Sequence, residues 1–243
     1  MTRYGSRTVT SEEYLIVSNA LPAPADSWAP SGKVAGYAIG SCALLTMLAI
    51  ALHPHSESRK ADELVVEVAR LAPMLRIVHG TVIAFMLALL YGFTIYSMRR
   101  GLRREAVVGA LVAYAAGVGV LVLAALIDGF LIPLVAARYA GVPPDVLRVG
   151  AGVLTLCGAA IQVLSKFGVI ALSAAIALWS TDLLRGRGVL RGAGIVGYAA
   201  ALIPLGVLFA GGEFLVPMTL SIIVIAQGIW YLAIATLLIR GRL

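Results

Sequence analysis

Long uncharged stretches alternate with short charged segments along most of the chain. A helix needs about 20 mostly apolar residues to cross the hydrocarbon core of a membrane. Six stretches satisfy this requirement and predict transmembrane helices over 34–52, 77–98, 106–127, 149–181, 192–212 and 214–239. The pattern therefore predicts an all-α fold, that of a polytopic helical membrane protein with six transmembrane helices.

Two connections that we place on the outer side carry helical patterns of their own. In 56–74 and just beyond, apolar residues recur at the spacing of one helix face: Leu64, Val68, Leu71 and Leu75. This predicts an amphipathic outer helix, which Pro73 should kink or end before the second span. The stretch 149–181 is longer than one span needs, so 144–164 is expected to be an outer helix or a protruding extension. The sequence leaves open whether one long helix or two cover it.

Basic residues are unequally distributed between the two sets of span ends. Six lie in the connections that we place outside, and twelve lie on the other side: Arg3, Arg7, Lys33, Arg99, Arg100, Arg103, Arg104, Arg185, Arg187, Arg191, Arg240 and Arg242. The positive-inside rule then places both termini in the cytoplasm of a multi-pass protein in the plasma (inner) membrane. Because no long polar linker divides the chain, we expect a cytoplasmic N-terminal tail over 1–33 and a single six-helix bundle over 34–243.

Composition supports the membrane assignment and excludes several classes of function. The chain is 60% hydrophobic and 13% charged, with a mean hydropathy of +0.97, which leaves too little polar surface for a soluble domain. The net charge of +7 comes from short clusters between apolar stretches, so the lipid bilayer is the expected partner and nucleic acid is not. The sequence lacks HExxH, a phosphate-binding loop of the Walker type, and GxSxG, and nothing points to ATP, a dinucleotide or a serine nucleophile.

The residues with the greatest potential for chemistry gather at one predicted depth. All three histidines and three isolated charges fall near the outer ends of the spans: His53, His55, His79, Asp128, Lys166 and Glu213. His79 and Lys166 each precede a basic cluster by about 20 residues, which places both roughly 28–30 Å from it. Asp128 follows the third span, and Pro133 is expected to free a backbone carbonyl near Gly129 and open the helix there.

This cluster suggests a metal or haem site at the outer, periplasm-facing membrane boundary. Imidazole suits copper, zinc or haem iron, and a carboxylate can complete or orient such a site. The proposed ligands are His53, His55, His79 and Asp128, with Lys166 and Glu213 as candidate polar support. We expect His79→Ala to abolish retention of the metal or haem b, which metal analysis and a visible spectrum of the purified protein would test.

Other interpretations remain open at this point. Each histidine can be a solvated residue at a helix end, and Asp128 can cap a kinked helix or pair with Lys166 or Arg138. The protein can instead be a non-catalytic accessory or structural subunit of a larger membrane complex, which mild detergent extraction would reveal. A transporter is less favoured, because the predicted midplane holds few polar groups. Whether the protein is an enzyme is undecided.

Some polar and aromatic residues inside the spans have simpler interpretations. Gln162 and Gln227 are expected to form hydrogen bonds between helices. Trp28, Trp179 and Trp230 are expected at the membrane interface or in packing contacts.

Overall fold

The computed structural model describes residues 32–51, 61–212 and 216–243, which form helices and no strands. Gly32–Leu243 make up one compact unit. The elements are α2 (Gly32–Ala51), α3 (Ala61–Arg100), α4 (Glu105–Leu126), a π-helical turn η1 (Ile127–Leu131), α5 (Ile132–Tyr139), α6 (Pro144–Leu184), α7 (Val189–Phe209) and α8 (Pro217–Ile239). The all-α prediction is confirmed for these residues, whereas His53, His55 and Glu213 lie outside them.

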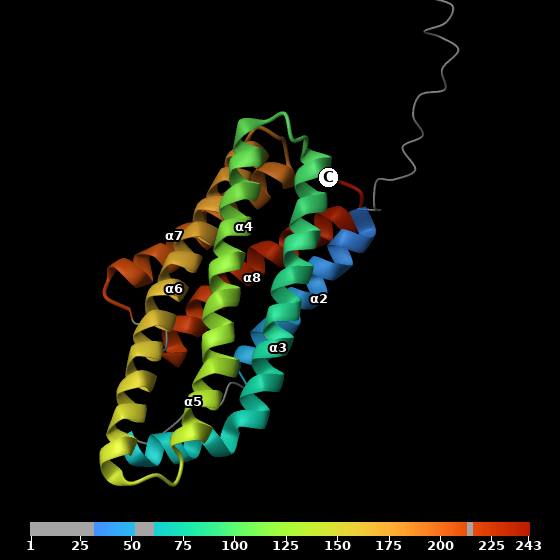
Figure 1. Cartoon of the computed structure of the whole chain (residues 1–243). Helices are drawn as coiled ribbons and strands as arrows, with labels where there is room; N and C mark the ends of the chain where they lie inside the picture. Colours follow the sequence, from blue (N-terminus) through green and yellow to red (C-terminus); the bar gives the residue numbers. More distant parts are fainter. Residues whose placement is uncertain (1–31, 52–60, 213–215) are drawn as a thin grey trace, which may run out of the picture. The chain divides into compact units, whose positions relative to one another are not determined.

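The long helices form a closed ring within the described part of the chain (Figure 1). Around the ring, α2 packs on α3, α3 on α4, α4 on α6, α6 on α7, α7 on α8, and α8 on α2. The contact between α2 and α8 is close because Gly36 has no side chain. A Cβ atom at Gly36 would lie 2.8 Å from the carbonyl oxygen of Ala235. Small residues thus allow these apolar helices to approach one another.

Five helical stretches of the described residues are long and apolar enough to cross a membrane. They are α3, the continuous run from α4 through η1 to α5, then α6, α7 and α8. These are the helices of an integral, multi-pass membrane protein. In α2, the apolar stretch Gly32–Leu48 is shorter than the others. The first predicted span, over 34–52, and with it the count of six, therefore stays a prediction.

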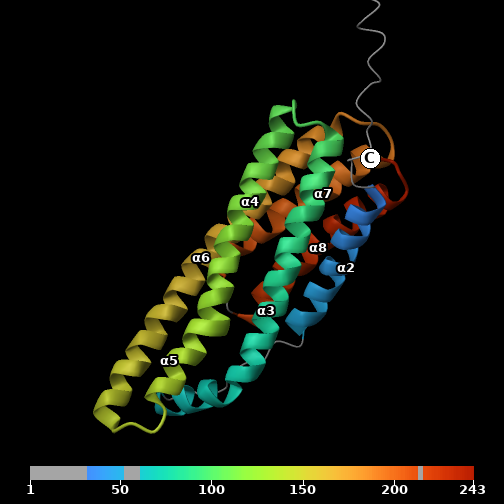
Figure 2. The same ribbon diagram turned by 45° about the vertical axis from the view of Figure 1, so that its right-hand side comes forward.

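Two of the helices are far longer than one membrane crossing. α6 has 41 residues and α3 has 40, whereas α7 has 21 and α8 has 23. At 1.5 Å per residue α6 is about 60 Å long, roughly twice the thickness of the hydrocarbon core. The stretch that the sequence left undecided is one continuous helix. Figure 2 shows the start of α6, together with α5, extending past the ends of α2 and α8.

The first part of α3 is an amphipathic segment that turns away from the bundle axis. In Figure 1 it runs across the bottom of the view, near α5 and the start of α6. Val65 is fully buried there against Ala136 of α5 and Leu154 of α6. Pro73 lies inside α3 and has no N–H for the helical hydrogen bond, which weakens the helix at that turn. The helix continues through Pro73 rather than ending there.

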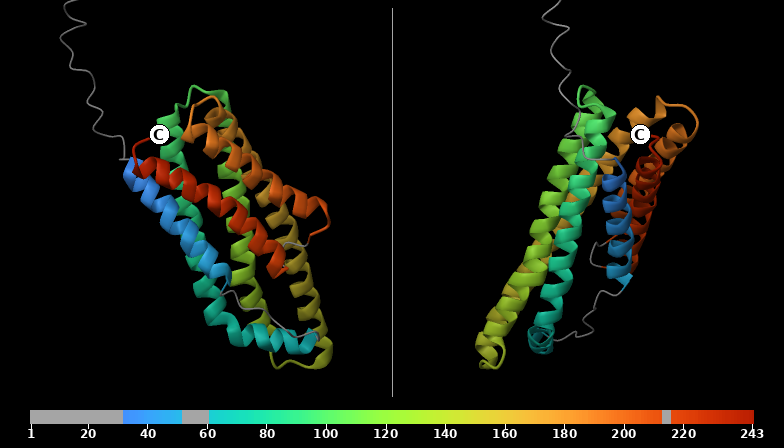
Figure 3. Two further views of the ribbon diagram at one scale, coloured as in Figure 1. Left: turned by 180° about the vertical axis from the view of Figure 1, so that it is seen from behind. Right: turned by 90° about the vertical axis from the view of Figure 1, so that its right-hand side faces the viewer.

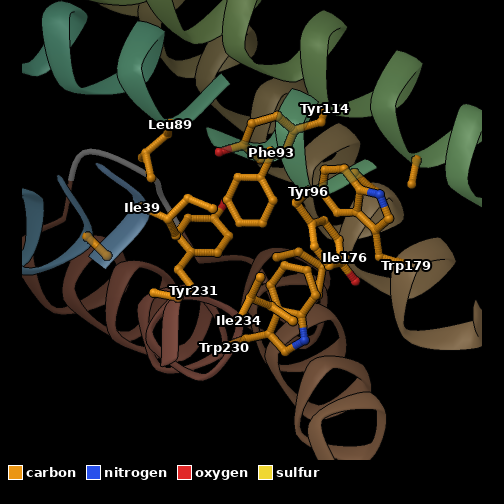
Figure 4. Packing of buried hydrophobic residues seen from close by; sticks show 14 of the residues in the cluster. Ile39, Leu89, Phe93, Tyr96, Tyr114, Ile176, Trp179, Trp230, Tyr231 and Ile234 are labelled. Atoms are coloured by element: carbon orange, nitrogen blue, oxygen red, sulfur yellow. The ribbon is translucent and has the colours of Figure 1, made fainter. Parts of the chain in front are cut away.

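An aromatic cluster packs in the interior of the ring (Figure 4). Phe93 of α3 packs beside two tryptophans, with ring centroids 5.0 Å from Trp179 of α6 and 5.7 Å from Trp230 of α8, and the two tryptophan rings lie 6.0 Å apart. All three side chains are fully buried, so both tryptophans are packing residues. The indole N–H of Trp179 donates a hydrogen bond to the hydroxyl of Ser97, 3.1 Å away. This bond satisfies a polar group that has no access to water.

Candidate functional site

The site begins with the π-helical turn at the end of α4. Pro133 lacks an N–H group, so the carbonyl of Gly129 loses its usual helical donor. The backbone accommodates this with the wider turn η1, in which the N–H of Ile132 bonds to the carbonyl of Ile127. Such single wide turns are frequent at functional sites. The predicted opening of the helix is confirmed, but the helix then continues through α5 instead of ending near Asp128.

This turn brings Asp128 against His79 of α3. The Nε2 atom of His79 lies 3.0 Å from Oδ2 of Asp128, and Nδ1 lies 2.8 Å from the carbonyl oxygen of Leu75. A carbonyl can only accept, so Nδ1 carries a hydrogen in either charge state of the ring. A single proton is then shared between Nε2 and Oδ2. The pair is either imidazolium with carboxylate or neutral imidazole with carboxylic acid, and it has no net charge in either form.

The two partners differ in how far they are exposed. The side chain of His79 is 7% exposed, whereas that of Asp128 is 30% exposed. Oδ2 of Asp128 is engaged by the imidazole, and Oδ1 has no hydrogen-bond partner among the described residues. The pair therefore presents one carboxylate oxygen that can accept a hydrogen bond from another molecule.

Metal binding receives no support from the described residues. Among them, no group of three or more His, Cys, Asp or Glu side chains is arranged to hold a metal ion. Both ring nitrogens of His79 face protein acceptors, so a metal would have to displace Asp128 or the carbonyl of Leu75. His53 and His55 lie outside the described residues, and their part in such a site stays a prediction.

The remaining predicted residues do not join the pair where they are described. Asp128 pairs with His79, and its ion pair is with neither Lys166 nor Arg138. Lys166 is half-buried on α6, next to Ser165, and forms no ion pair within the described ranges. Of the predicted cluster, the structure thus brings together His79 and Asp128.

A cavity of about 710 Å³ opens beside the pair, between α2, α3, α4, α6 and α8. Its wall is mostly aliphatic and includes Val82, Leu121, Val169 and Val224. His79 and Asp128 line one part of it, while other polar side chains lie elsewhere on the wall: Thr46, Tyr114, Ser165, Gln227 and Tyr231. A volume of 300–1,000 Å³ with an apolar wall and a few polar groups is typical of small-molecule sites.

Gln227 links two sides of this cavity. Its side-chain N–H₂ donates to the hydroxyl of Ser173 on α6 over 3.3 Å, which agrees with the predicted bond between helices. At 6% exposure, Gln227 needs this partner, because an unpaired buried amide is costly.

Sequence reasoning missed a second polar centre at the opposite end of the bundle. Asp182 of α6 is only 1% exposed and accepts hydrogen bonds from two arginines. Nε of Arg100 lies 2.7 Å from Oδ2, and Nη1 of Arg104 lies 2.7 Å from Oδ1. The available signal was the acidic residue Asp182, next to the arginines that follow the fourth predicted span. Interpreting those arginines only as orientation signals concealed it.

Comparison of the chain with models of known protein families, with curated proteins and with solved structures finds no match. The function must therefore be argued from the site itself.

Proposed function

We propose that this membrane protein binds an amphipathic molecule in the cavity beside His79 and Asp128. The observation that carries the proposal is an apolar cavity of about 710 Å³ with one partly exposed carboxylate in its wall. The apolar body of the ligand would replace weakly held water or lipid against the aliphatic wall. Removing apolar surface from water stabilises the complex by about 25 cal/mol per Å². The polar end of the ligand would bond to Asp128.

The chemistry of the pair specifies what that polar end must offer. Oδ1 of Asp128 needs a donor, so a hydroxyl, amine or N–H group fits and a bare carbonyl does not. His79 holds the other carboxylate oxygen and fixes the orientation of the group, as a supporting residue does in many binding sites. The favoured ligand is therefore a lipid-like molecule with a donor group at one end.

The proposed orientation puts this cavity nearer the outer face. His79 and Arg100 are 21 positions apart on α3, or roughly 31 Å along a helix. The end of α3, the start of α2 and the C-terminal end of α8 lie at the same end of the bundle (Figure 3). With both termini in the cytoplasm, as charge distribution favours, Asp128 faces the outer half of a plasma membrane.

The test is to identify molecules that copurify with the protein. Mass spectrometry of an organic extract should show a compound enriched over bulk lipid. Val82→Trp, which fills the cavity, should remove it. The matched control is Val112→Trp on α4, at a side chain that is 64% exposed and points away from the core. Asp128→Asn should weaken retention of the compound without filling the cavity.

Several results would overturn the proposal. Equal retention by Val82→Trp and Val112→Trp, with both variants monodisperse, would exclude the cavity as the site. Metal or a Soret band in native material, lost in His79→Ala, would favour a site completed by His53 or His55. A stable hetero-complex after mild extraction, with no enriched ligand, would favour the accessory-subunit alternative. Uptake of a solute into proteoliposomes would favour transport.

A further inference from the structure

The opposite end of the bundle holds a second, basic pocket that the proposed function does not use. It has a volume of about 410 Å³ and is lined by Arg100, Arg104, Asp182, Arg185, Gly186 and Leu190. It lies where α3, α4, α6 and α7 end or begin. These helices are the ones whose apolar stretches cross the membrane, so the pocket sits at the level of lipid headgroups on the proposed cytoplasmic side.

The charge of this region is strongly positive. The segments 97–108 and 182–191 contain seven arginines and two acidic residues, Glu105 and Asp182, for a net charge of +5. Within the pocket, three arginines face one carboxylate, which leaves +2. The positive-inside rule explains why arginines gather at this end. It does not explain why a buried aspartate should fix two of them around a hollow.

Asp182 organises the pocket. Its buried carboxylate binds Nε and Nη2 of Arg100 through Oδ2, and Nη1 of Arg104 through Oδ1. A guanidinium has five N–H donors, so each arginine retains unused donors in a fixed position. The side chain of Arg100 is 14% exposed and that of Arg104 is 49% exposed, which keeps one of these donor groups open to water.

Arg185 completes the arrangement without being tied to an acid. It is exposed, lines the pocket, and forms no ion pair within the described ranges. α7 begins at Val189 beside the pocket, and the N-terminal end of a helix carries a partial positive charge. Planar, fixed guanidinium groups present paired N–H donors that match the oxygen atoms of a phosphate group.

We propose that this pocket binds a phosphate group, held by Arg100, Arg104 and Arg185. The phosphate can belong to an anionic lipid headgroup or to a soluble phosphate ester, since both present the same oxygens. Asp182 is a positioning residue that holds two of the arginines and does not contact the phosphate. The site is independent of the cavity beside Asp128.

The experiment uses the full chain in a neutral detergent and measures three probes. Native mass spectrometry follows the addition of phosphatidylglycerol and of phosphatidylcholine, and calorimetry follows inorganic phosphate. We expect saturable binding of one phosphatidylglycerol and about tenfold weaker binding of phosphatidylcholine, equal to about 1.4 kcal/mol. If millimolar inorganic phosphate binds and displaces phosphatidylglycerol, the phosphate group belongs to a soluble ligand. Binding of the lipid alone would identify the headgroup.

Two variants that each remove one positive charge distinguish binding in the pocket from general attraction by the basic surface. Arg185→Gln should raise the Kd of the bound probe about tenfold, because one charge-assisted contact is lost. Arg187→Gln, two positions away, exposed and outside the pocket, should change it less than twofold. If both variants weaken binding of the probe equally, the binding is due to the charge of the surface and not to the pocket. Absence of binding by phosphatidylglycerol and phosphate would overturn the proposal outright.

Discussion

The backbone of Gly129 passes directly against the side chain of His79. A Cβ atom at Gly129 would collide with Cβ of His79 and come within 2.7 Å of Cγ. The π-helical turn of α4 and the straight part of α3 can therefore meet at this depth only because residue 129 has no side chain. The contact between His79 and Asp128 depends on it.

Gly129→Ala is the direct test of this close approach. The added methyl group should push α3 and η1 apart and destabilise the fold by about 1–3 kcal/mol, as overpacking does. Thermal unfolding in detergent measures the effect. The control is Gly119→Ala on α4, where a Cβ would meet no atom within 4 Å. Equal melting temperatures for the two variants would contradict the geometry.

The coupling between His79 and Asp128 can be measured by a double-mutant cycle. Single changes to alanine leave a buried imidazole or a half-buried carboxylate without its partner. The double variant removes both groups, so its loss in free energy of unfolding should be smaller than the summed losses of the two single variants. We expect a coupling energy of about 0.5–3 kcal/mol from reversible unfolding in mixed micelles. Strict additivity would mean that the two side chains do not interact.

Asp182 should be the acidic residue whose loss costs most. Asp182→Ala leaves Arg100, whose side chain is 14% exposed, without its counter-charge, and removing one partner of a buried pair costs about 3–5 kcal/mol. The control is Asp145→Ala, in the exposed pair with Arg148 near the start of α6. That change should fall within about 1 kcal/mol of wild type. Chemical unfolding of both variants in the same detergent provides the comparison.

Two adjacent valines test the packing of the first part of α3. Val65 is fully buried against α5 and α6, whereas Val66 is 56% exposed. Val65→Ala should destabilise the protein by about 1–3 kcal/mol and increase hydrogen exchange in this segment. Val66→Ala should have little effect on either. The opposite ranking would show that the segment packs through another face.

Topology is best tested with new cysteines, because Cys157 is buried and free rather than accessible. After both native cysteines are replaced, Arg148→Cys should react with an impermeant maleimide added to intact cells. Arg187→Cys should react only after the membrane is opened. Both positions are exposed, so differences in burial do not confound the comparison. The reverse pattern would invert the proposed orientation.

The sequence predicted the depth of His79 and Asp128 but not their contact. Counting residues from the arginine clusters puts both at a similar height along their helices, since the rise per residue of a helix is constant. The contact joins positions 49 apart and needs the two helices to be neighbours, rotated so that these side chains face each other. Pro133 and Gly129 indicated a distorted turn near Asp128. Neither residue indicates which other helix packs against that turn.

The sequence by itself determined the helices, their membrane character and the uneven charge at their ends. In a bilayer every backbone group must bond within its own helix, so a long apolar stretch is sufficient to specify the element. Tertiary structure alone decided the order of the ring, the cavity and the partners of Asp182. The physical reason is that lipid is as apolar as the protein interior, so α4, α7 and α8 carry no polar face to mark which side turns inward. That choice depends on the fit of side chains between helices, such as Gly36 against α8 and Phe93 against Trp179 and Trp230.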